Sequence, residues 1–176
     1  MALHVCCGPC AGAVIERLSR LWEVTAVWFN PNIQPEDEHR RRLEAMRIVV
    51  ERTATPLTVL EYDVERWREL CAELRDEPEG GARCEVCFRM RLEETARWAV
   101  AAGIEVITTT LTISPHKDAK RIHEIGAEVA ARHGLRFLPE DFKKGGGFQR
   151  SVELSREWGL FRQRYCGCLP AGPSPD

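Results

Sequence analysis

The chain has 176 residues, of which 44% are hydrophobic and 30% charged, a balance typical of one globular domain. Its 25 basic and 27 acidic residues give a formal net charge of −2, which excludes a generally basic nucleic-acid coat but not a local basic patch. No apolar run approaches the roughly 18 residues of a membrane span, and residues 1–6 lack the pattern of a signal peptide. We therefore expect a cytoplasmic protein with reduced thiols, in which 8 cysteines indicate a metal or redox function.

Short apolar runs alternate with longer amphipathic segments in the first half of the chain. A strand at 2–5 leads through a cysteine loop at 6–10 into a helix that includes 13–21. A β-branched and aromatic strand at 24–29 ends at the turn 30–32 and is followed by a charged helix over 36–52. A strand at 57–60 precedes a helix over 63–74 with Asp63 as its N-cap, and the composition of 76–83 indicates a loop.

The second half continues this alternation. A helix from about 88 to 102 is closed by Gly103 and followed by a strand at 104–109. Ser114-Pro115 is expected to open a helix that reaches His133 and is closed by Gly134. A strand at 136–138, a glycine-rich loop at 140–147 and a helix over 148–158 complete the series.

The repeated strand–helix order predicts a single α/β domain over residues 1–169, with a parallel sheet and helices on both faces. In such sheets the ligand site lies at the carboxyl ends of the strands. The cysteine-rich loop after the first strand and the segments after Phe29 and Thr109 are therefore expected to lie close together. Residues 170–176 are expected to form a disordered tail.

Seven of the eight cysteines fall into three short groups whose spacing is typical of metal or redox sites. The groups are Cys6, Cys7 and Cys10, then Cys84 and Cys87, then Cys166 and Cys168. The first two groups lie at loop-to-helix junctions, where a helix N-terminus stabilises thiolates. Cys71 stands alone at an apolar helical position and is interpreted as a small buried hydrophobe.

Thiolates from the first two groups can form a four-cysteine site for zinc or for an iron–sulfur cluster. Two spaced pairs, Cys7 with Cys10 and Cys84 with Cys87, are typical of structural zinc. Vicinal Cys6 and Cys7 cannot easily turn both sulfurs onto one small tetrahedral ion, and they favour a wider cluster. The residues favour iron–sulfur and leave zinc open.

Two further interpretations compete with an iron–sulfur enzyme. The motif CGPC at 7–10 is typical of thioredoxin-like thiol–disulfide oxidoreductases, although this leaves the other cysteine groups unused. A zinc-stabilised nucleic-acid-binding module is the non-enzymatic alternative. Cys166 and Cys168, with one residue between them, can close a strained and readily reduced disulfide that passes two electrons, or can serve as extra ligands.

Six segments that follow one another along nearly the whole chain resemble the cobalamin-independent epoxyqueuosine reductases (QueH type). They are HVCCGPC at 4–10, FNPNIQP at 29–35, RCEVCFRMRLEETA at 83–96, TTLTISPHKD at 109–118, DFKKGGGFQRS at 141–151 and LFRQRYCGC at 160–168. The resemblance implies reduction of epoxyqueuosine in a tRNA anticodon to queuosine, with loss of the epoxide oxygen as water. It implies a nucleotide α-hydrolase-like (HUP) fold in which the cysteine loop replaces a phosphate loop.

The resemblance also implies which residues act. Carried over by position, Cys6, Cys7, Cys84 and Cys87 hold a [4Fe–4S] cluster, and Cys166 and Cys168 are the catalytic redox-active pair. Some members have aspartate where this chain has Cys10, which makes Cys10 a candidate ligand of an additional mononuclear iron with a softer donor. Electrons come from a donor that the sequence does not identify.

A tRNA substrate requires local positive charge on a chain whose net charge is −2. Candidate contacts are Arg40, Arg41, Arg42, His116, Lys117, Lys143, Lys144, Arg150, Arg162 and Arg164, with Phe148 and Tyr165 as candidate stacking partners of an unpaired base. The arginine triplet is also typical of a solvated helix face, the lysine pair of a surface loop, and the two aromatic residues of core positions.

Histidines and aspartates are the candidate proton donors. His116 and His123 are seven residues apart, which predicts that they share one helix face. His4 is interpreted as a packing residue in the first strand. Asp118 and Asp141 are candidate acids or metal ligands, with N-capping or loop hydrogen bonding as the simpler interpretation.

Overall fold

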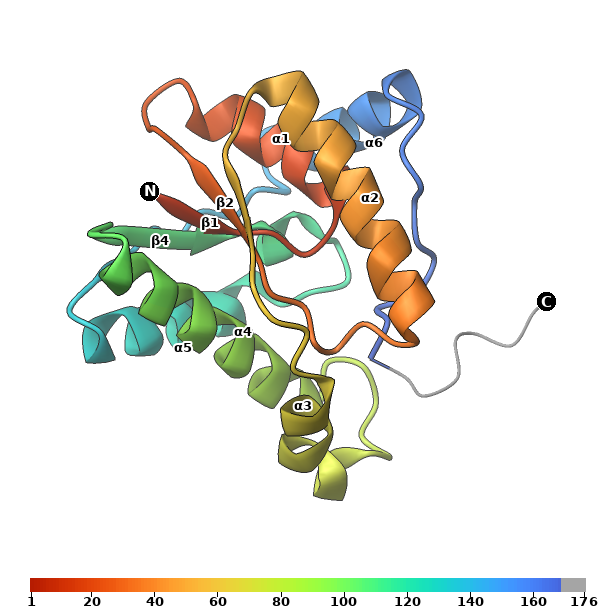
Figure 1. The fold of residues 1–176 in the computed structure, drawn as a ribbon, viewed down its shortest axis with the longest axis vertical. Coiled ribbons are helices and arrows are strands. Elements are labelled where there is room, and N and C mark those ends of the chain that lie inside the picture. The colour runs from red at the N-terminus through yellow and green to blue at the C-terminus, as the bar shows by residue number, and fades with distance from the viewer. Residues whose placement is uncertain (169–176) are drawn as a thin grey trace.

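Five short strands form one parallel sheet in the computed structural model, which describes residues 1–168 (Figure 1). The strands are β1 (Ala2–His4), β2 (Thr25–Trp28), β3 (Leu57–Val59), β4 (Val106–Thr109) and β5 (Arg136–Phe137). Their order across the sheet is β3-β2-β1-β4-β5, and every neighbouring pair is parallel. This is the order of a doubly wound α/β sheet, and it confirms the predicted fold class. The tail predicted at 170–176 lies outside the described residues.

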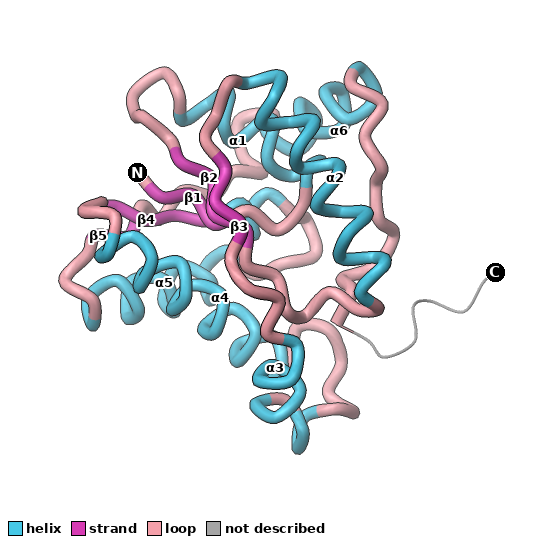
Figure 2. Tube along the Cα trace, in the orientation of Figure 1, coloured by secondary structure: helices cyan, strands magenta, loops and turns pink. Residues whose placement is uncertain are grey.

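Helices cover both faces of the sheet, as Figures 1 and 2 show. On one face α1 (Gly8–Leu18) packs between α2 (Glu36–Thr53) and α6 (Gly147–Glu157), and on the other face α4 (Ala82–Ala101) packs against α5 (Ala119–Arg132). The short helix α3 (Val64–Leu70) packs against α4. Two 3-10 turns complete the described part, η1 (Ala72–Leu74) and η2 (Thr110–Ile113).

The hydrophobic core is divided by the sheet. Successive side chains on a strand point to opposite faces, so Leu3 packs with the residues of α1 and α2 while Ala2 packs with those of α4 and α5. Trp28 and Met46 are fully buried on the first side, and Ile107 is fully buried on the second. Within residues 1–168, no helix combines the length and the apolar character required to cross a bilayer.

Three helix boundaries differ from the sequence prediction. The predicted loop at 76–83 ends early, because α4 begins at Ala82 and its first turns bury Cys84 and Cys87 against the core. The helix predicted to open at Ser114 begins only at Ala119, because the Asp118 side chain accepts hydrogen bonds from the backbone N–H groups of residues 120 and 121. Helix α3 ends at Leu70 and is followed by η1, whereas the predicted N-cap Asp63 is confirmed.

The loops at the carboxyl ends of β1, β2 and β4 meet, as predicted. The amide of Asn30, after β2, donates to the carbonyl of Val5 at 2.9 Å. The backbone N–H of Cys6, after β1, donates to the hydroxyl of Thr110, after β4, at 3.1 Å. Both bonds are partly or fully buried, so they fix the cysteine loop between its two neighbours.

Gly8 allows α1 to begin in direct backbone contact with α2. A Cβ atom at Gly8 would lie 2.5 Å from the carbonyl oxygen of Ala45, which cannot move without moving α2. We expect Gly8→Ala to lower the free energy of unfolding by about 1–3 kcal/mol, measured by urea denaturation. Gly12→Ala is the matched control, because its Cβ would meet side chains rather than backbone, with the ring end of Trp158 at 2.8 Å and the end of Leu154 at 3.4 Å. Equal losses in the two variants would contradict the backbone contact as the cause.

Candidate functional site

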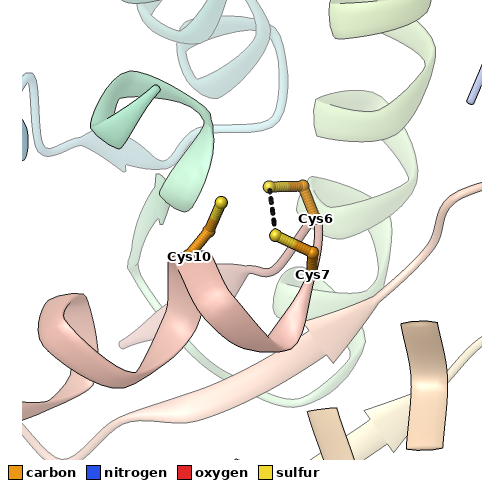
Figure 3. Close-up of side chains that lie close together, drawn as sticks. All are labelled: Cys6, Cys7 and Cys10. Carbon is orange, nitrogen blue, oxygen red and sulfur yellow. Dashed lines mark hydrogen bonds between the residues drawn. The ribbon is translucent and has the colours of Figure 1, made fainter. Parts of the chain in front are cut away.

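The first cysteine group lies where β1 passes into α1. The Sγ atoms of Cys6, Cys7 and Cys10 all lie within 4.8 Å of one another, and those of Cys6 and Cys7 are 3.9 Å apart. Figure 3 shows the three side chains turned toward one another at the start of α1. Cys7 is the N-cap of α1 and Cys10 lies in its first turn, so the partial positive charge of the helix end favours thiolates. This cluster of sulfur atoms can hold a metal.

Hydrogen bonds among these three thiols give them different pKa values. The bonds that Cys10 and Cys7 donate hold the pKa of Cys6 well below its usual range despite burial, and the Thr110 hydroxyl donates another bond to Cys6 Sγ at 3.3 Å. Burial raises the pKa of Cys7 to about 12, and the bond to Cys6 raises the pKa of Cys10. Cys7 is also fully buried. It is therefore a poor attacking thiol, which argues against the thioredoxin-like interpretation.

Cys84 and Cys87 lie in the first two turns of α4 and are 5% and 4% exposed. Cys84 belongs to the hydrophobic cluster against which Cys6 packs, and its Sγ accepts a bond from the backbone N–H of Gly80 at 3.2 Å. Cys87 Sγ lies 3.9 Å from Nη1 of Arg91. The structure thus brings the second cysteine group to the region of Cys6. Among residues 1–168, however, the group whose sulfurs lie within 4.8 Å contains only the three cysteines of the first loop.

Arg91 is a buried charge at the centre of these cysteines. It is 2% exposed, its Nε donates to Nε2 of His4 at 3.3 Å, and its Nη2 donates to Oδ1 of Asn30. Burial opposes its charge, but the negative charges of Cys87 and Cys6 raise its pKa. No carboxylate within residues 1–168 forms an ion pair with it. The guanidinium is therefore held among sulfur atoms and neutral groups.

His4 supports this arrangement from β1. Burial lowers its pKa to about 3, so the imidazole is neutral. Since Nε2 accepts from Arg91, the proton lies on Nδ1, which donates to the hydroxyl of Thr109 at 2.8 Å. The first strand, the fourth strand and α4 are thereby joined through one buried network.

Cys166 and Cys168 form the third group and differ strongly in acidity. The hydrogen bond from Cys168 lowers the pKa of Cys166 to about 5 against the effect of burial, and the same bond raises that of Cys168. Nζ of Lys117 lies 3.8 Å from Cys166 Sγ and 3.2 Å from the carboxylate of Glu79. Burial opposes the Lys117 charge, yet the Cys166 thiolate and Glu79 together raise its pKa. The arrangement provides a thiolate, a thiol and an ammonium group in contact.

Arg42 anchors the backbone that carries this pair. The segment after α6 runs beside α2 to the start of that helix, as Figure 2 shows. Arg42, 2% exposed on α2, donates to the carbonyl oxygens of Cys166 at 2.8 Å and Tyr165 at 3.1 Å, and its Nε lies 2.7 Å from the carboxylate of Glu38. The backbone N–H of Gln34 donates to the carbonyl of Gly167 at 2.9 Å. Arg42, a candidate RNA contact from the sequence, thus binds groups of the protein itself.

Removing Arg42 is expected to release this segment. Arg42→Met leaves the carboxylate of Glu38, whose side chain is 11% exposed, without its partner, and it leaves the carbonyls of Cys166 and Tyr165 without their donor. We expect a loss of about 3–5 kcal/mol in the free energy of unfolding, measured by urea denaturation. Limited proteolysis should then cut near Cys166. Arg47→Gln is the control on the same helix, because its ion pair with Glu44 is exposed and contributes at most about 1 kcal/mol. Similar losses in both variants would contradict an anchoring role.

A cavity of about 430 Å³ joins the first and third cysteine groups. Cys6, Cys10 and Cys166 line it, and so does Arg91. Its volume lies in the range of sites that receive small molecules or single bases. Of the candidate RNA contacts, His116, Lys117, Arg42, Arg162, Arg164, Phe148 and Tyr165 line the cavity.

The other candidate contacts lie elsewhere. Arg40 is exposed and pairs with Glu36 and Asp37, and Arg150 pairs with Glu16 and Glu153. Arg41 lies over the ring of Phe161 at 3.7 Å. Lys143 and Lys144 both pair with Asp141, which agrees with the simpler interpretation of that aspartate. Asp118 likewise serves as an N-cap.

The prediction that His116 and His123 share a helix face is wrong. Helix α5 begins at Ala119, so His116 lies in the preceding turn and lines the cavity. His123 lies inside the helix beside the ring of Phe137, with 6.2 Å between the ring centroids. The helical spacing argument fails because Asp118 caps the helix after His116.

Arg91 and the anchoring role of Arg42 were not predicted from the sequence. A signal for Arg91 was present, because residues 84, 87 and 91 recur at the spacing of one helix face. That pattern places a basic side chain in line with two cysteines on one face of the helix. No comparable signal exists for the anchoring role of Arg42. Its ion pair with Glu38 is local, but the backbone carbonyls that it holds lie more than 120 residues away.

The chain matches the family model described as Epoxyqueuosine reductase QueH over residues 1–172. It is 41% identical over 175 residues to the Epoxyqueuosine reductase QueH of Streptococcus pyogenes serotype M1, covering 96% of this chain and 69% of that protein. It is 36% identical to the proteins of the same name from Staphylococcus epidermidis, covering 95% and 74%, and from Thermotoga maritima, covering 95% and 87%. The chain therefore belongs to the epoxyqueuosine reductase QueH family.

Proposed function

We propose that this chain reduces epoxyqueuosine in a tRNA anticodon to queuosine in the cytosol, and that Cys6, Cys7, Cys84 and Cys87 hold a [4Fe–4S] cluster. The names of the relatives support the reaction. The observation that carries the cluster assignment is the buried guanidinium of Arg91 among cysteine sulfurs.

A buried arginine without a carboxylate partner needs another negative charge, because an unpaired ion in the interior costs several kcal/mol. Thiolates at Cys6 and Cys87 would supply that charge, and a cluster bound by four thiolates would carry it permanently. The donor set consists of sulfur, which suits iron–sulfur clusters better than it suits hard cations. The residues present therefore fit such a cluster.

When bound, the cluster would supply electrons one at a time at low potential. Converting the epoxide to an alkene requires two electrons and two protons and releases water. In their reduced form Cys166 and Cys168 hold two electrons, with one proton on the Cys168 thiol and a second on Lys117, whose Nζ lies 3.8 Å from the Cys166 thiolate. The cavity lined by Cys6, Cys10 and Cys166 would receive the modified base.

Other residues of the first cavity are placed to bind tRNA. Phe148 and Tyr165 would stack on the base, and Arg162 and Arg164 are exposed where a phosphate could approach. Cys10 would be a ligand of an additional mononuclear iron, since its sulfur lies within the group of three and is left unused by the cluster.

Metal analysis of anaerobically purified protein tests the assignment. We expect iron and sulfide in a ratio set by one cluster, with a fifth iron if Cys10 binds the additional ion. Mass spectrometry of tRNA digests should show conversion of epoxyqueuosine to queuosine. One zinc per chain without sulfide would support the zinc-stabilised module, and metal-free protein that reduces disulfides would support the thioredoxin-like alternative.

Replacing Cys168 should separate cluster binding from turnover. Cys168→Ser removes one electron carrier of the pair without touching the four proposed ligands. We expect unchanged iron content but no more than one product per chain, measured with limiting electron donor. A steady-state rate equal to that of the unaltered chain in the Cys166, Cys168 double variant would remove the disulfide from the mechanism.

A further inference from the structure

A second cavity lies behind Cys168 and is separate from the one already described. Its volume is about 250 Å³, and its lining includes Trp67, Arg68, Cys71, Arg75, Arg83 and Cys168. Among residues 1–168, the two cavities share no lining residue. Arg68 and Arg75 are exposed, so this cavity opens to solvent.

The Cys166-Gly167-Cys168 segment stands between the two cavities. Cys166 lines the first and Cys168 lines the second. Gly167 has a φ of +99°, a conformation that turns the chain here and that other residues rarely adopt. One member of the pair can thus face the substrate cavity while the other faces a different entrance.

Two buried hydrogen-bond donors in the second cavity have no acceptor within residues 1–168. Nε1 of Trp67 and Nε of Arg83 are buried and have no hydrogen-bond partner within the described chain, and these side chains belong to residues only 5% and 3% exposed. Nη1 of Arg83 donates to the backbone carbonyl of Arg75. Neither Arg75 nor Arg83 forms an ion pair with a carboxylate among residues 1–168. The third arginine of the cavity, Arg68, already pairs with Glu65 and donates to Oε1 of Gln34. The two buried donors, together with the guanidinium groups of Arg75 and Arg83, therefore favour an anionic ligand.

The remaining wall is apolar and sulfur-rich. Trp67, Cys71 and Cys168 belong to one hydrophobic cluster with Phe29 and Met90. Burial raises the pKa of Cys71 to about 11, so that it stays a neutral thiol and serves as apolar surface. A ligand that matches this cavity is small, carries a carboxylate for the arginines and places a soft group against Cys168.

We propose that this cavity binds a low-mass anionic thiol that reduces the Cys166–Cys168 disulfide after each turnover. The proposal rests on the proposed function, which oxidises this pair. It assigns the second entrance to the reductant while the tRNA occupies the first. Cys168 is then the residue through which electrons enter.

The exchange balances with two thiols of the ligand. The ligand thiolate attacks Cys168 Sγ, a mixed disulfide forms, and the bond to Cys166 breaks with Cys166 leaving as a thiolate beside Lys117. A second ligand thiolate attacks the ligand sulfur of the mixed disulfide and releases Cys168. Two ligand thiols are oxidised to one disulfide, and the protein disulfide is reduced to two thiols.

Three small thiols of similar size and different charge test the proposal. The oxidised protein, purified with its metal, is treated with 3-mercaptopropionate, 2-mercaptoethanol or 2-mercaptoethylamine. Thiol-specific alkylation and mass spectrometry then follow the appearance of free Cys166 and Cys168. We expect the anionic thiol to be favoured over the cationic one by at least about tenfold after correction for their rates with a model disulfide, and less so at high salt.

Variants of the cavity's arginines test whether the preference for the anionic thiol arises at this cavity. Arg75→Gln combined with Arg68→Gln removes two exposed charges, and Arg83→Gln removes the buried one; each is expected to reduce the preference at least about threefold. Arg97→Gln is the control, because it removes the same charge from an exposed position on α4. Since Arg83 is buried, the exposed double variant keeps the test valid if Arg83→Gln fails to fold.

Each outcome has one meaning. Absence of a preference in the unaltered chain, or an unchanged preference in the exposed double variant, overturns the proposal. A block of thiol reduction by saturating tRNA also overturns it and assigns the cavity to an RNA phosphate. A single turnover of epoxyqueuosine-containing tRNA by dithionite-reduced protein tests the proposed function separately, because dithionite needs no thiol site. If tRNA is reduced but the anionic thiol is not preferred, only the proposed thiol site is refuted. If the anionic thiol is preferred but tRNA is not reduced, only the proposed reductase activity is refuted.

Discussion

Replacing Cys84 or Cys87 by serine is expected to remove the iron and the broad visible absorption of the anaerobically purified protein. Both thiols are buried on α4, and serine offers a harder oxygen donor in place of a soft thiolate. Because loss of even an outer-sphere partner lowers metal affinity or activity by about 10–100-fold, loss of a ligand should lower reduction of epoxyqueuosine by at least a hundredfold. Iron analysis, the visible spectrum and the tRNA assay measure these effects.

Cys71→Ala is the matched control for these two variants. Cys71 is another buried cysteine, at the end of α3, which packs against α4, and its removal leaves a small cavity without taking a proposed ligand. We expect its iron content to equal that of the unaltered chain. Full iron content and full turnover in Cys84→Ser would refute the four-cysteine assignment. Loss of iron in Cys71→Ala would show that iron loss in the serine variants does not identify ligands.

Arg91→Met should produce the second large effect. It should change the stability of the metal-free chain little and should weaken the binding of iron strongly. Without metal, the substitution removes a buried charge that has no carboxylate partner but also leaves Nε2 of His4 and Oδ1 of Asn30 without their donor. These two effects oppose each other, so the free energy of unfolding of the reduced chain should change by less than about 3 kcal/mol. With metal, it removes the positive charge that faces Cys6 and Cys87, and we expect the affinity for iron to fall by about 10–100-fold. Urea denaturation of metal-free protein and chelator competition of the loaded protein measure the two effects.

Arg91→Lys refines this test. Lysine keeps the charge but cannot reach His4, Asn30 and Cys87 together, because it lacks the planar fork of the guanidinium group. Its iron affinity should lie between those of the unaltered chain and Arg91→Met. A metal-free Arg91→Met chain destabilised by several kcal/mol, with unaltered iron affinity, would make Arg91 a core residue unrelated to the metal.

The cysteine motifs could be interpreted from the sequence because their chemistry is local. Cys6, Cys7 and Cys10 lie within five residues at one strand-to-helix junction, so any folded form that keeps this junction brings their sulfurs together. Neighbouring parallel strands end at one edge of the sheet, and the loops after β1, β2 and β4 therefore had to meet. The position of Asp63 as an N-cap followed from the same local rules.

The start of α4 and α5 could not be predicted in this way. Composition indicated a loop up to residue 83, but burial of Cys84 and Cys87 against the core stabilises the helix from Ala82 onward. Ser114-Pro115 carries a helix-opening signal, yet η2 and the turn after it occupy this segment and leave Asp118 to cap α5. Tertiary contacts outweigh propensities that differ by less than about 1 kcal/mol per residue.

The amino-acid sequence by itself determined the alternating architecture, the family and the cysteines that meet at one strand end, since these depend on periodicity and on neighbours along the chain. Only the tertiary structure decided that Arg91 lies buried among the sulfurs, that Arg42 holds the backbone at Cys166, and that Cys166 and Cys168 face different cavities. These features join residues from opposite ends of the chain, and such contacts exist only after the sheet and its helices have packed.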